Sequence, residues 1–256
     1  MDPSTSDRRV GRWSAMLAIL VIAAACSSTG SGSSAASPAS PASSPSQAIA
    51  STPGPTASPT VGSTQGRRVE AQVLGSGTLP TYSVEVPGGW SLGGKFITKS
   101  GVAVMGLSIW DVIQVPSDPC HWKGHLVDAG SAVGDLVPLL VAQEGRNASK
   151  PTDVTLAGRS GTYLEWSVPT DMVVTGDSDF EGCDRWPDNG HADFVSWLSS
   201  GGGERYQQVP GQVDRLWILD VDGKRLVVDA TYSPDATEAD RDELNGVAQS
   251  LRFANP

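Results

Sequence analysis

The protein has 256 residues, of which 18% are charged, and its formal net charge is −10. Because acidic side chains outnumber basic ones and the chain has no long basic run, the composition disfavours nucleic acids and anionic lipid surfaces as partners. The part of the chain that looks ordered has about the right length for one domain. We therefore expect a single acidic domain that binds no nucleic acid.

The first 25 residues have the pattern of an export signal. A basic segment at residues 7–12 precedes an apolar run at residues 15–25, which is too short to span a bilayer as a helix. The run ends at Ala24-Ala25-Cys26, which resembles the lipobox of bacterial lipoproteins. We expect residues 1–25 to be a lipoprotein signal peptide and Cys26 to carry the diacylglycerol. A simple cleaved signal is the alternative, because Ala23 stands where leucine is commoner.

A low-complexity segment follows Cys26. Residues 27–66 carry no charge and consist mostly of Ser, Ala, Thr, Gly and Pro, so they contain nothing from which a core can form. We expect residues 26–77 to be a disordered tether and residues 78–256 to be one folded domain. Signal and tether together predict an extracytoplasmic protein that a lipid anchors to the outer face of the cell membrane.

The first part of the domain has the pattern of strands. Residues 81–86 alternate between polar and apolar side chains and end at Pro87-Gly88-Gly89, which favours a turn. Residues 90–92 and 95–98 flank two glycines and predict a small hairpin. Residues 101–115 form one long β-like run in which successive apolar side chains point to opposite faces.

Two segments have helical periodicity. Residues 131–143 repeat apolar side chains at helical spacing behind Ser131, a fair N-cap, although Pro138 removes one hydrogen bond and favours a kink. Residues 237–250 begin with Thr237-Glu238-Ala239-Asp240, a variant of the capping box, with acidic side chains in the first turn, where the helix dipole favours them. We expect a helix in each segment.

The strongest β signal lies near the C-terminus. Residues 216–230 contain two apolar runs separated by Asp222-Gly223, the dipeptide best suited to a two-residue type I′ turn. We expect this hairpin at the centre of the sheet, with further strands at residues 153–157, 160–168, 194–198 and 205–208. Many hairpins and two separated helices predict class α+β, an antiparallel β-sheet covered by helices.

Several features together resemble one family. They are the lipobox signal, the Ser/Pro tether, Pro87-Gly88-Gly89-Trp90 after the first strand, the late Leu-Trp-Ile-Leu-Asp-Val-Asp-Gly hairpin, and a helix ending at Ser250-Leu251-Arg252-Phe253. In these features residues 78–253 are similar to actinobacterial lipoproteins with a Mog1/PsbP-like domain of the LpqN/LpqT kind. The resemblance implies an α/β/α sandwich and a surface location. It implies no catalytic residues, and several members of the family are accessory or partner-binding proteins. The insert around Cys183 departs from the family's pattern.

The domain contains Cys120 and Cys183. Outside the cell, two domain cysteines with no third competitor usually pair. We therefore expect a disulfide between them. Two free thiols, or a bond between two molecules, are the alternatives.

An acidic loop beside Cys183 has part of the spacing of a calcium site. Asp177, Asp179, Glu181 and Asp188 occupy positions 1, 3, 5 and 12 of an EF-hand-like loop and offer hard oxygen ligands to Ca²⁺. Against calcium, Asp184 stands where such a loop has an apolar anchor, and no helices flank the segment. A solvated acidic loop is the favoured interpretation, and a calcium site is the alternative.

Other patterns that could carry chemistry are weak. Cys120, His121, His125 and Asp128 have zinc-like identities, but zinc needs three or four ligands and Cys120 is expected to be oxidised. Residues 89–93 spell the nucleophile elbow G-x-S-x-G without the strand-to-helix context that this turn requires. We expect no metal, no cofactor and no catalytic residue.

Trp90, Trp122 and Trp186 lie at predicted turns or loops, where exposed rings can stack on sugars or on a partner protein. We take them as candidate ligand-binding residues, with burial at the ends of the sheet as the alternative. The leading functional hypothesis is a non-enzymatic binding or accessory module for an envelope protein, a glycan or a small apolar ligand. The alternatives are a secreted hydrolase that uses distant residues such as His191, and a structural subunit of an envelope complex.

Overall fold

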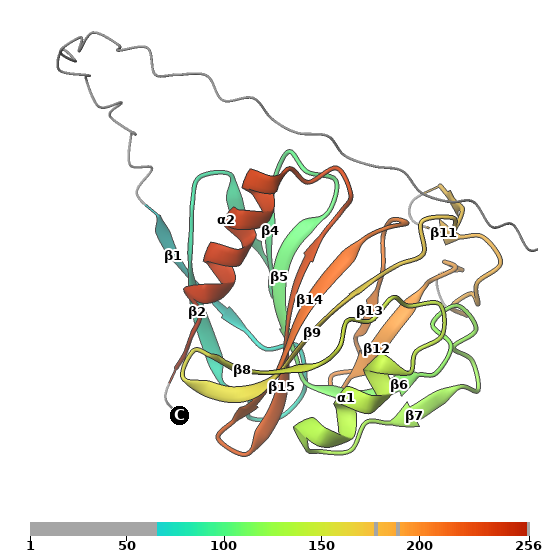
Figure 1. Cartoon of the computed structure of the whole chain (residues 1–256), viewed down its shortest axis with the longest axis horizontal. Coiled ribbons are helices and arrows are strands. Elements are labelled where there is room, and N and C mark those ends of the chain that lie inside the picture. The colour runs from blue at the N-terminus through green and yellow to red at the C-terminus, as the bar shows by residue number, and fades with distance from the viewer. Residues whose placement is uncertain (1–65, 177–178, 188–189, 255–256) are drawn as a thin grey trace, which may run out of the picture. The chain divides into compact units, whose positions relative to one another are not determined.

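A computed structural model describes residues 66–176, 179–187 and 190–254 (Figure 1). The predicted signal peptide, Cys26 and most of the predicted tether lie outside these residues. Within them, no helix combines the length and the apolar composition that crossing a membrane would need.

The described chain contains two helices, α1 (Val133–Val141) and α2 (Glu238–Gln249). The strands are β1 (Arg67–Gln72), β2 (Thr81–Val86), β3 (Trp90–Gly93), β4 (Phe96–Lys99), β5 (Met105–Trp110), β6 (Val112–Pro116), β7 (Leu126–Asp128), β8 (Thr152–Leu156), β9 (Arg159–Ser167), β10 (Val174–Thr175), β11 (Asp179–Phe180), β12 (Val195–Ser199), β13 (Glu204–Tyr206), β14 (Val213–Val221), β15 (Lys224–Tyr232) and β16 (Arg252–Phe253).

The largest sheet is antiparallel and has seven strands in the order β3-β4-β5-β15-β14-β9-β8. Its centre is the β14–β15 hairpin, which is paired over its whole length. Asp222 and Gly223 reverse the chain with φ angles of 54° and 79°, the positive values that a type I′ turn requires. The predicted central hairpin is confirmed.

The side chains of each central strand alternate between two cores. Leu216 and Ile218 of β14 point to one core, and Trp217 and Leu219 point to the other. The first core lies between the large sheet, α1 and a four-stranded sheet of order β13-β12-β6-β7, and we call this side the α1 face. The second core lies between the large sheet, α2 and a three-stranded sheet of order β1-β2-β16, and we call this side the α2 face. Figure 1 shows both helices beside the large sheet.

The fold is therefore of class α+β with antiparallel sheets. The expected α/β/α sandwich, in which helices alone cover the two faces of the sheet, is wrong. Each face is covered by one short helix together with a smaller sheet. The reason lies at Asp111, where the predicted run of residues 101–115 divides into β5 of the large sheet and β6 of the four-stranded sheet. The Asp111 N–H donates to the carbonyl of Leu74 (2.8 Å), and its carbonyl accepts from the N–H of Ser200 (3.0 Å), which fixes this corner.

The N-terminal boundary of the domain differs from prediction, and the C-terminus carries a strand that was not predicted. The tether was expected to extend to residue 77, yet β1 begins at Arg67 and pairs with β2. Val69 and Ala71 of β1 are buried and the polar side chains between and around them are exposed, so this segment has the apolar–polar alternation of a strand. At the other end, Arg252 and Phe253 do not extend the last helix but form β16 against β2.

Both predicted helices are present, with different caps. Thr237 precedes α2, where its Oγ1 accepts from the N–H of Asp240 (3.2 Å) and Asp240 Oδ2 accepts from the N–H of Thr237 (2.9 Å), as the capping box predicts. In α1 the N-cap is Ala132 instead of Ser131, because the Asp135 carboxylate accepts from the N–H groups of both residues. Pro138 lies inside α1.

Candidate functional site

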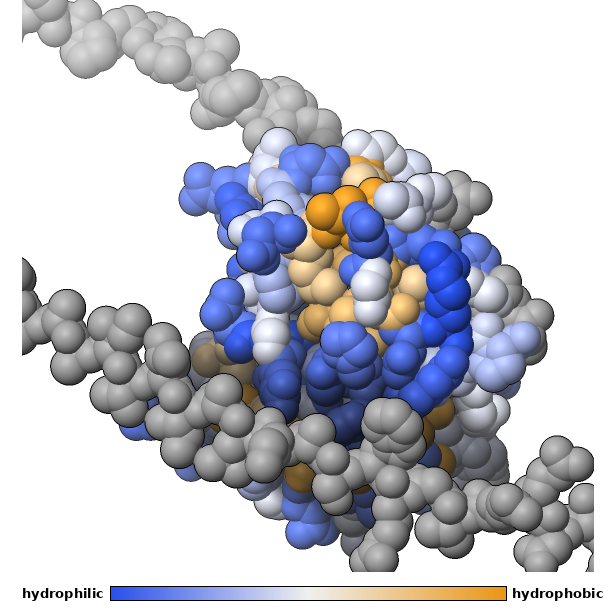
Figure 2. Space-filling model, turned by 90° about the vertical axis from the view of Figure 1, so that its right-hand side faces the viewer, coloured by the Kyte–Doolittle hydropathy of each residue, from blue (hydrophilic) through white to orange (hydrophobic). Residues whose placement is uncertain are grey.

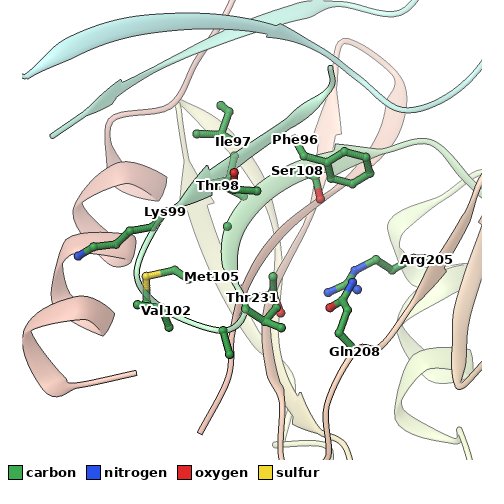
Figure 3. Close-up of a pocket in the computed structure, with 14 residues that line it drawn as sticks. Phe96, Ile97, Thr98, Lys99, Val102, Met105, Ser108, Arg205, Gln208 and Thr231 are labelled. Carbon is green, nitrogen blue, oxygen red and sulfur yellow. The ribbon is translucent and has the colours of Figure 1, made fainter. Parts of the chain in front are cut away.

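A pocket of about 280 Å³ opens between the β4–β5 end of the large sheet and β13 (Figure 3). Its lining combines aliphatic and aromatic side chains with hydroxyl and amide groups and two cations. The lining residues are Phe96, Ile97, Thr98, Lys99, Val102, Ala103, Val104, Met105, Gly106, Leu107, Ser108, Arg205, Gln208 and Thr231.

The floor of the pocket is a row of cross-strand neighbours on the α1 face. Thr98 of β4 pairs with Gly106 of β5, and Gly106 pairs with Thr231 of β15. A Cβ atom at Gly106 would lie 2.7 Å from the carbonyl oxygen of Ile97. No side chain therefore fits at residue 106, and the floor is recessed at this point, as expected where a strand glycine marks a close approach.

The apolar wall is made by the β4–β5 hairpin and its aromatic support. Phe96 is 41% exposed and meets the ring of Trp110 edge-on, with 5.8 Å between centroids. Trp110 itself is buried, and its indole N–H donates to the hydroxyl of Ser108 (2.8 Å). On the surface turned to the viewer in Figure 2, hydrophobic side chains gather in one area that hydrophilic ones surround.

The polar wall is Arg205 of β13, which reaches across to the large sheet. Its Nε donates to Asp229 Oδ2 (2.5 Å), its Nη2 donates to Asp214 Oδ1 (2.8 Å), and its Nη1 donates to the carbonyl of Tyr206. Figure 3 shows Arg205 and Gln208 below Phe96 and Ser108, with Thr231 beside Gln208. Arg205 thus joins the four-stranded sheet to β14 and β15.

A second buried cation completes this network. The guanidinium of Arg146 lies over the ring of Trp166, 4.2 Å from its centroid, and donates to the Ser196 hydroxyl (2.7 Å). Its Nη1 is 3.9 Å from Asp214 Oδ2, which also accepts from the indole N–H of Trp166 (2.8 Å). Two arginines and two aspartates therefore share one buried cluster, which we call the buried charge network: Arg146, Arg205, Asp214 and Asp229.

The two carboxylates of the network differ in acidity. Burial tends to raise the pKa of Asp214, but the charges of Arg205 and Arg146 outweigh burial and lower it. Burial raises the pKa of Asp229 to about 7. The charge of Arg205 acts to lower this pKa, and the charge of Asp214 acts to raise it. Both carboxylates are buried, but the charges of two arginines act on Asp214, whereas the charge of Asp214 raises the pKa of Asp229 and Asp229 Oδ1 has no hydrogen-bond partner within the described chain. Within the network the pKa of Asp214 is therefore lowered and that of Asp229 is raised.

Lys99 of β4, the other cation of the lining, is also paired. Its Nζ lies 2.8 Å from Asp240 Oδ1 and 3.0 Å from Glu243 Oε2, both on α2. Figure 3 shows its ammonium group directed away from Thr231 and Arg205, toward that helix. Burial tends to lower the pKa of Lys99, but the bonds to Asp240 and Glu243 raise it.

The three predicted tryptophans do not share a cavity. Trp90 is buried in the core of the α2 face, where its indole N–H donates to Glu243. Trp122 and Trp186 stack on each other with 4.0 Å between ring centroids. Their facing surfaces are therefore occupied, and neither ring is part of the pocket lining.

The loops that carry this stacked pair are joined by the predicted disulfide. The Sγ atoms of Cys120 and Cys183 are 2.04 Å apart, so the pairing is confirmed. The backbone N–H of Asp184 also donates to the carbonyl of Cys120 (2.8 Å). Covalent and hydrogen bonds thus place Trp122 next to Trp186.

In the acidic loop, the carboxylate of Asp179 contacts the imidazole of His191. Asp177 and Asp188, two of the four predicted calcium ligands, lie outside the described residues. Asp179 Oδ1 lies 2.9 Å from His191 Nδ1 and Asp179 Oδ2 lies 3.1 Å from Arg185 Nη1, so protein groups contact both oxygens. Glu181 is exposed.

The zinc-like residues do not gather into a donor set within the described chain. His121 Nδ1 lies 2.9 Å from Asp118 Oδ2, and that bond raises the pKa of the imidazole. The N–H of His125 donates to the carbonyl of Trp122 (3.1 Å), which orders the same loop. Asp128 ends β7, where its carboxylate accepts from the N–H of Gly130 (2.8 Å).

No family model and no curated protein matches the sequence. The structure is similar to the crystal structure of LpqN, described as involved in cell envelope biogenesis of Mycobacterium tuberculosis. That match has 16% sequence identity and a TM-score of 0.37, and it covers 73% of this chain and 92% of that chain. The structure is also similar to the solution structure of a cyanobacterial PsbP, CyanoP from Synechocystis, with 14% identity and a TM-score of 0.34, over 78% of this chain and 98% of that chain. LpqN and PsbP are the two kinds of protein that the resemblance in the sequence names.

Proposed function

We propose that the protein is a lipid-anchored, extracytoplasmic binding module without enzymatic activity, and that it holds a small, largely apolar ligand in the pocket between β4–β5 and β13. The signal-like N-terminus, Cys26 and the tether support the location and the anchor. The Cys120–Cys183 disulfide supports an oxidising compartment.

The observation that carries the proposal is the pocket itself. It is a preformed hollow with apolar side chains on one wall and a few convergent polar groups, the composition that small-molecule sites share. Its depth follows from Gly106, where the neighbouring backbone excludes a side chain. An apolar ligand would displace water from Phe96 and the hairpin residues, which is favourable in proportion to the apolar area removed from water.

The chemistry of the lining supports binding in preference to catalysis. Its polar groups are hydroxyls, an amide and two cations that carboxylates already hold. A hydrolase needs a base beside a nucleophile in a pocket. His191, the predicted base, lies outside this lining, with its Nδ1 next to Asp179.

Filling the pocket tests the assignment. Thr98→Leu adds apolar volume at an exposed position of the floor, so we expect it to weaken binding of 2-naphthalenemethanol, measured by calorimetry, by about tenfold or more. The matched control is Thr155→Leu, the same change at an exposed position of the edge strand β8, which should leave the affinity unchanged. Equal affinities for the wild type and Thr98→Leu would show that the probe binds elsewhere, and no binding to the wild type would refute the site.

A further inference from the structure

The two cations at the pocket are each held by two carboxylates. Lys99 lies between Asp240 and Glu243, and Arg205 lies between Asp214 and Asp229. A site built to bind an anion would present an arginine whose N–H groups face the ligand. Here each of the three guanidinium nitrogens of Arg205 donates one hydrogen bond to a protein oxygen, and the charge of the group is balanced by two carboxylates before any ligand arrives.

The polar groups that remain are uncharged. The Ser108 hydroxyl accepts from Trp110 (2.8 Å) and so keeps its own proton for donation, whereas the Thr231 hydroxyl accepts from the Gln212 amide (2.8 Å) and also hydrogen-bonds to Asp214. The side-chain oxygen of Gln208 is buried and makes no hydrogen bond within the described chain. Hydroxyl and amide groups of this kind match a neutral polar group on a ligand.

A ligand carboxylate would meet an unfavourable field. Asp214 and Asp229 lie behind Arg205, in a buried network that contains equal numbers of arginines and aspartates when both acids are ionised. An anion entering the pocket would lose its hydration without gaining an unmatched cation. The net charge of −10 adds a weak long-range repulsion.

From this pairing we propose that the pocket selects an uncharged, largely apolar ligand that carries a hydroxyl or amide group, and that it discriminates against carboxylates. The inference rests on the proposed function, because it names the ligand class of the same pocket. The discrimination arises from Asp214 and Asp229, which neutralise Arg205, and from Asp240 and Glu243, which neutralise Lys99.

Two probes of nearly equal shape test this selection. At about pH 8, we expect calorimetry to show that the wild type binds 2-naphthalenemethanol about tenfold more tightly than 2-naphthoate, the matching carboxylate. Equal affinities, or tighter binding of 2-naphthoate, would overturn the inference while leaving the pocket established. Failure of both probes to bind would overturn the proposed function, and the inference with it.

A change of charge in the network provides the second arm. Asp229→Asn leaves Arg205 with one carboxylate, so we expect it to raise the affinity for 2-naphthoate, relative to that for 2-naphthalenemethanol, by about tenfold. Asp153→Asn, which removes the same charge from the exposed edge strand β8, should change neither affinity. If Asp229→Asn does not fold, the wild-type preference alone decides. A folded Asp229→Asn variant with an unchanged ratio of the two affinities would contradict the assigned cause.

Discussion

Replacing Arg205 with methionine is expected to lower the free energy of unfolding by about 3–5 kcal/mol, measured by urea denaturation. The side chain of Arg205 is 5% exposed, and it lies between two fully buried carboxylates, Asp214 and Asp229. Methionine conserves much of the volume but leaves these charges without their main partner, and an uncompensated buried charge is among the costliest single defects in a protein.

Two further variants separate this cause from lost packing. Arg68→Met removes a cation from the surface pair with Glu85, whose side chains are 49% and 59% exposed, so we expect a loss of no more than about 1 kcal/mol. Adding Asp229→Asn to Arg205→Met should restore part of the lost stability, because it removes one of the unpaired charges. If the double variant is less stable than Arg205→Met alone, the stabilisation by Arg205 is not electrostatic.

Acidification should stabilise the wild type relative to Asp229→Asn. The pKa of Asp229 is raised in the folded protein from 3.8 to about 7, mainly by burial, so the folded state holds this proton more tightly than the unfolded state. Protonation of Asp229 therefore adds least to the free energy of unfolding above pH 7, and it adds more as the pH falls to about 4. Since one pKa unit corresponds to about 1.4 kcal/mol, the change is on the order of 4 kcal/mol at most.

The measurement is urea denaturation of both proteins at several pH values between about 4 and 8. As the pH falls, the free energy of unfolding of the wild type should rise relative to that of Asp229→Asn. Asp240 acts in the opposite direction, because its bonds to Lys99 and Thr237 lower its pKa, and it is present in both proteins. A difference that stays constant, or that favours the wild type only as the pH rises, would contradict a raised pKa for Asp229.

The central part of the fold can be predicted from local patterns. Alternation over residues 216–230 and the Asp222-Gly223 turn specify the β14–β15 hairpin, and Thr237 with Asp240 specifies the start of α2. Local patterns do not reveal which sheet a strand joins. The run of residues 101–115 has the correct two faces, since Leu107 and Trp110 point into different cores, but its division between two sheets depends on distant partners.

The candidate site was not predicted, for the same reason. Thr98, Gly106 and Thr231 become neighbours only through the register of three strands, and Arg205 reaches them from another sheet. One local signal was available, because a glycine inside a strand such as Gly106 often marks close backbone approach or a ligand. The tryptophans were a poorer guide, because Trp90 is buried in the core of the α2 face and Trp122 stacks on Trp186.

The central claim is that the pocket between β4–β5 and β13 is the ligand site, and mapping by NMR tests it most directly. With ¹⁵N-labelled protein titrated with 2-naphthalenemethanol, we expect the largest amide shift changes at Thr98, Gly106, Ser108 and Thr231, with saturation at one common affinity. Changes confined to another surface, such as the stacked pair Trp122 and Trp186, would contradict the account, as would the absence of any saturable change.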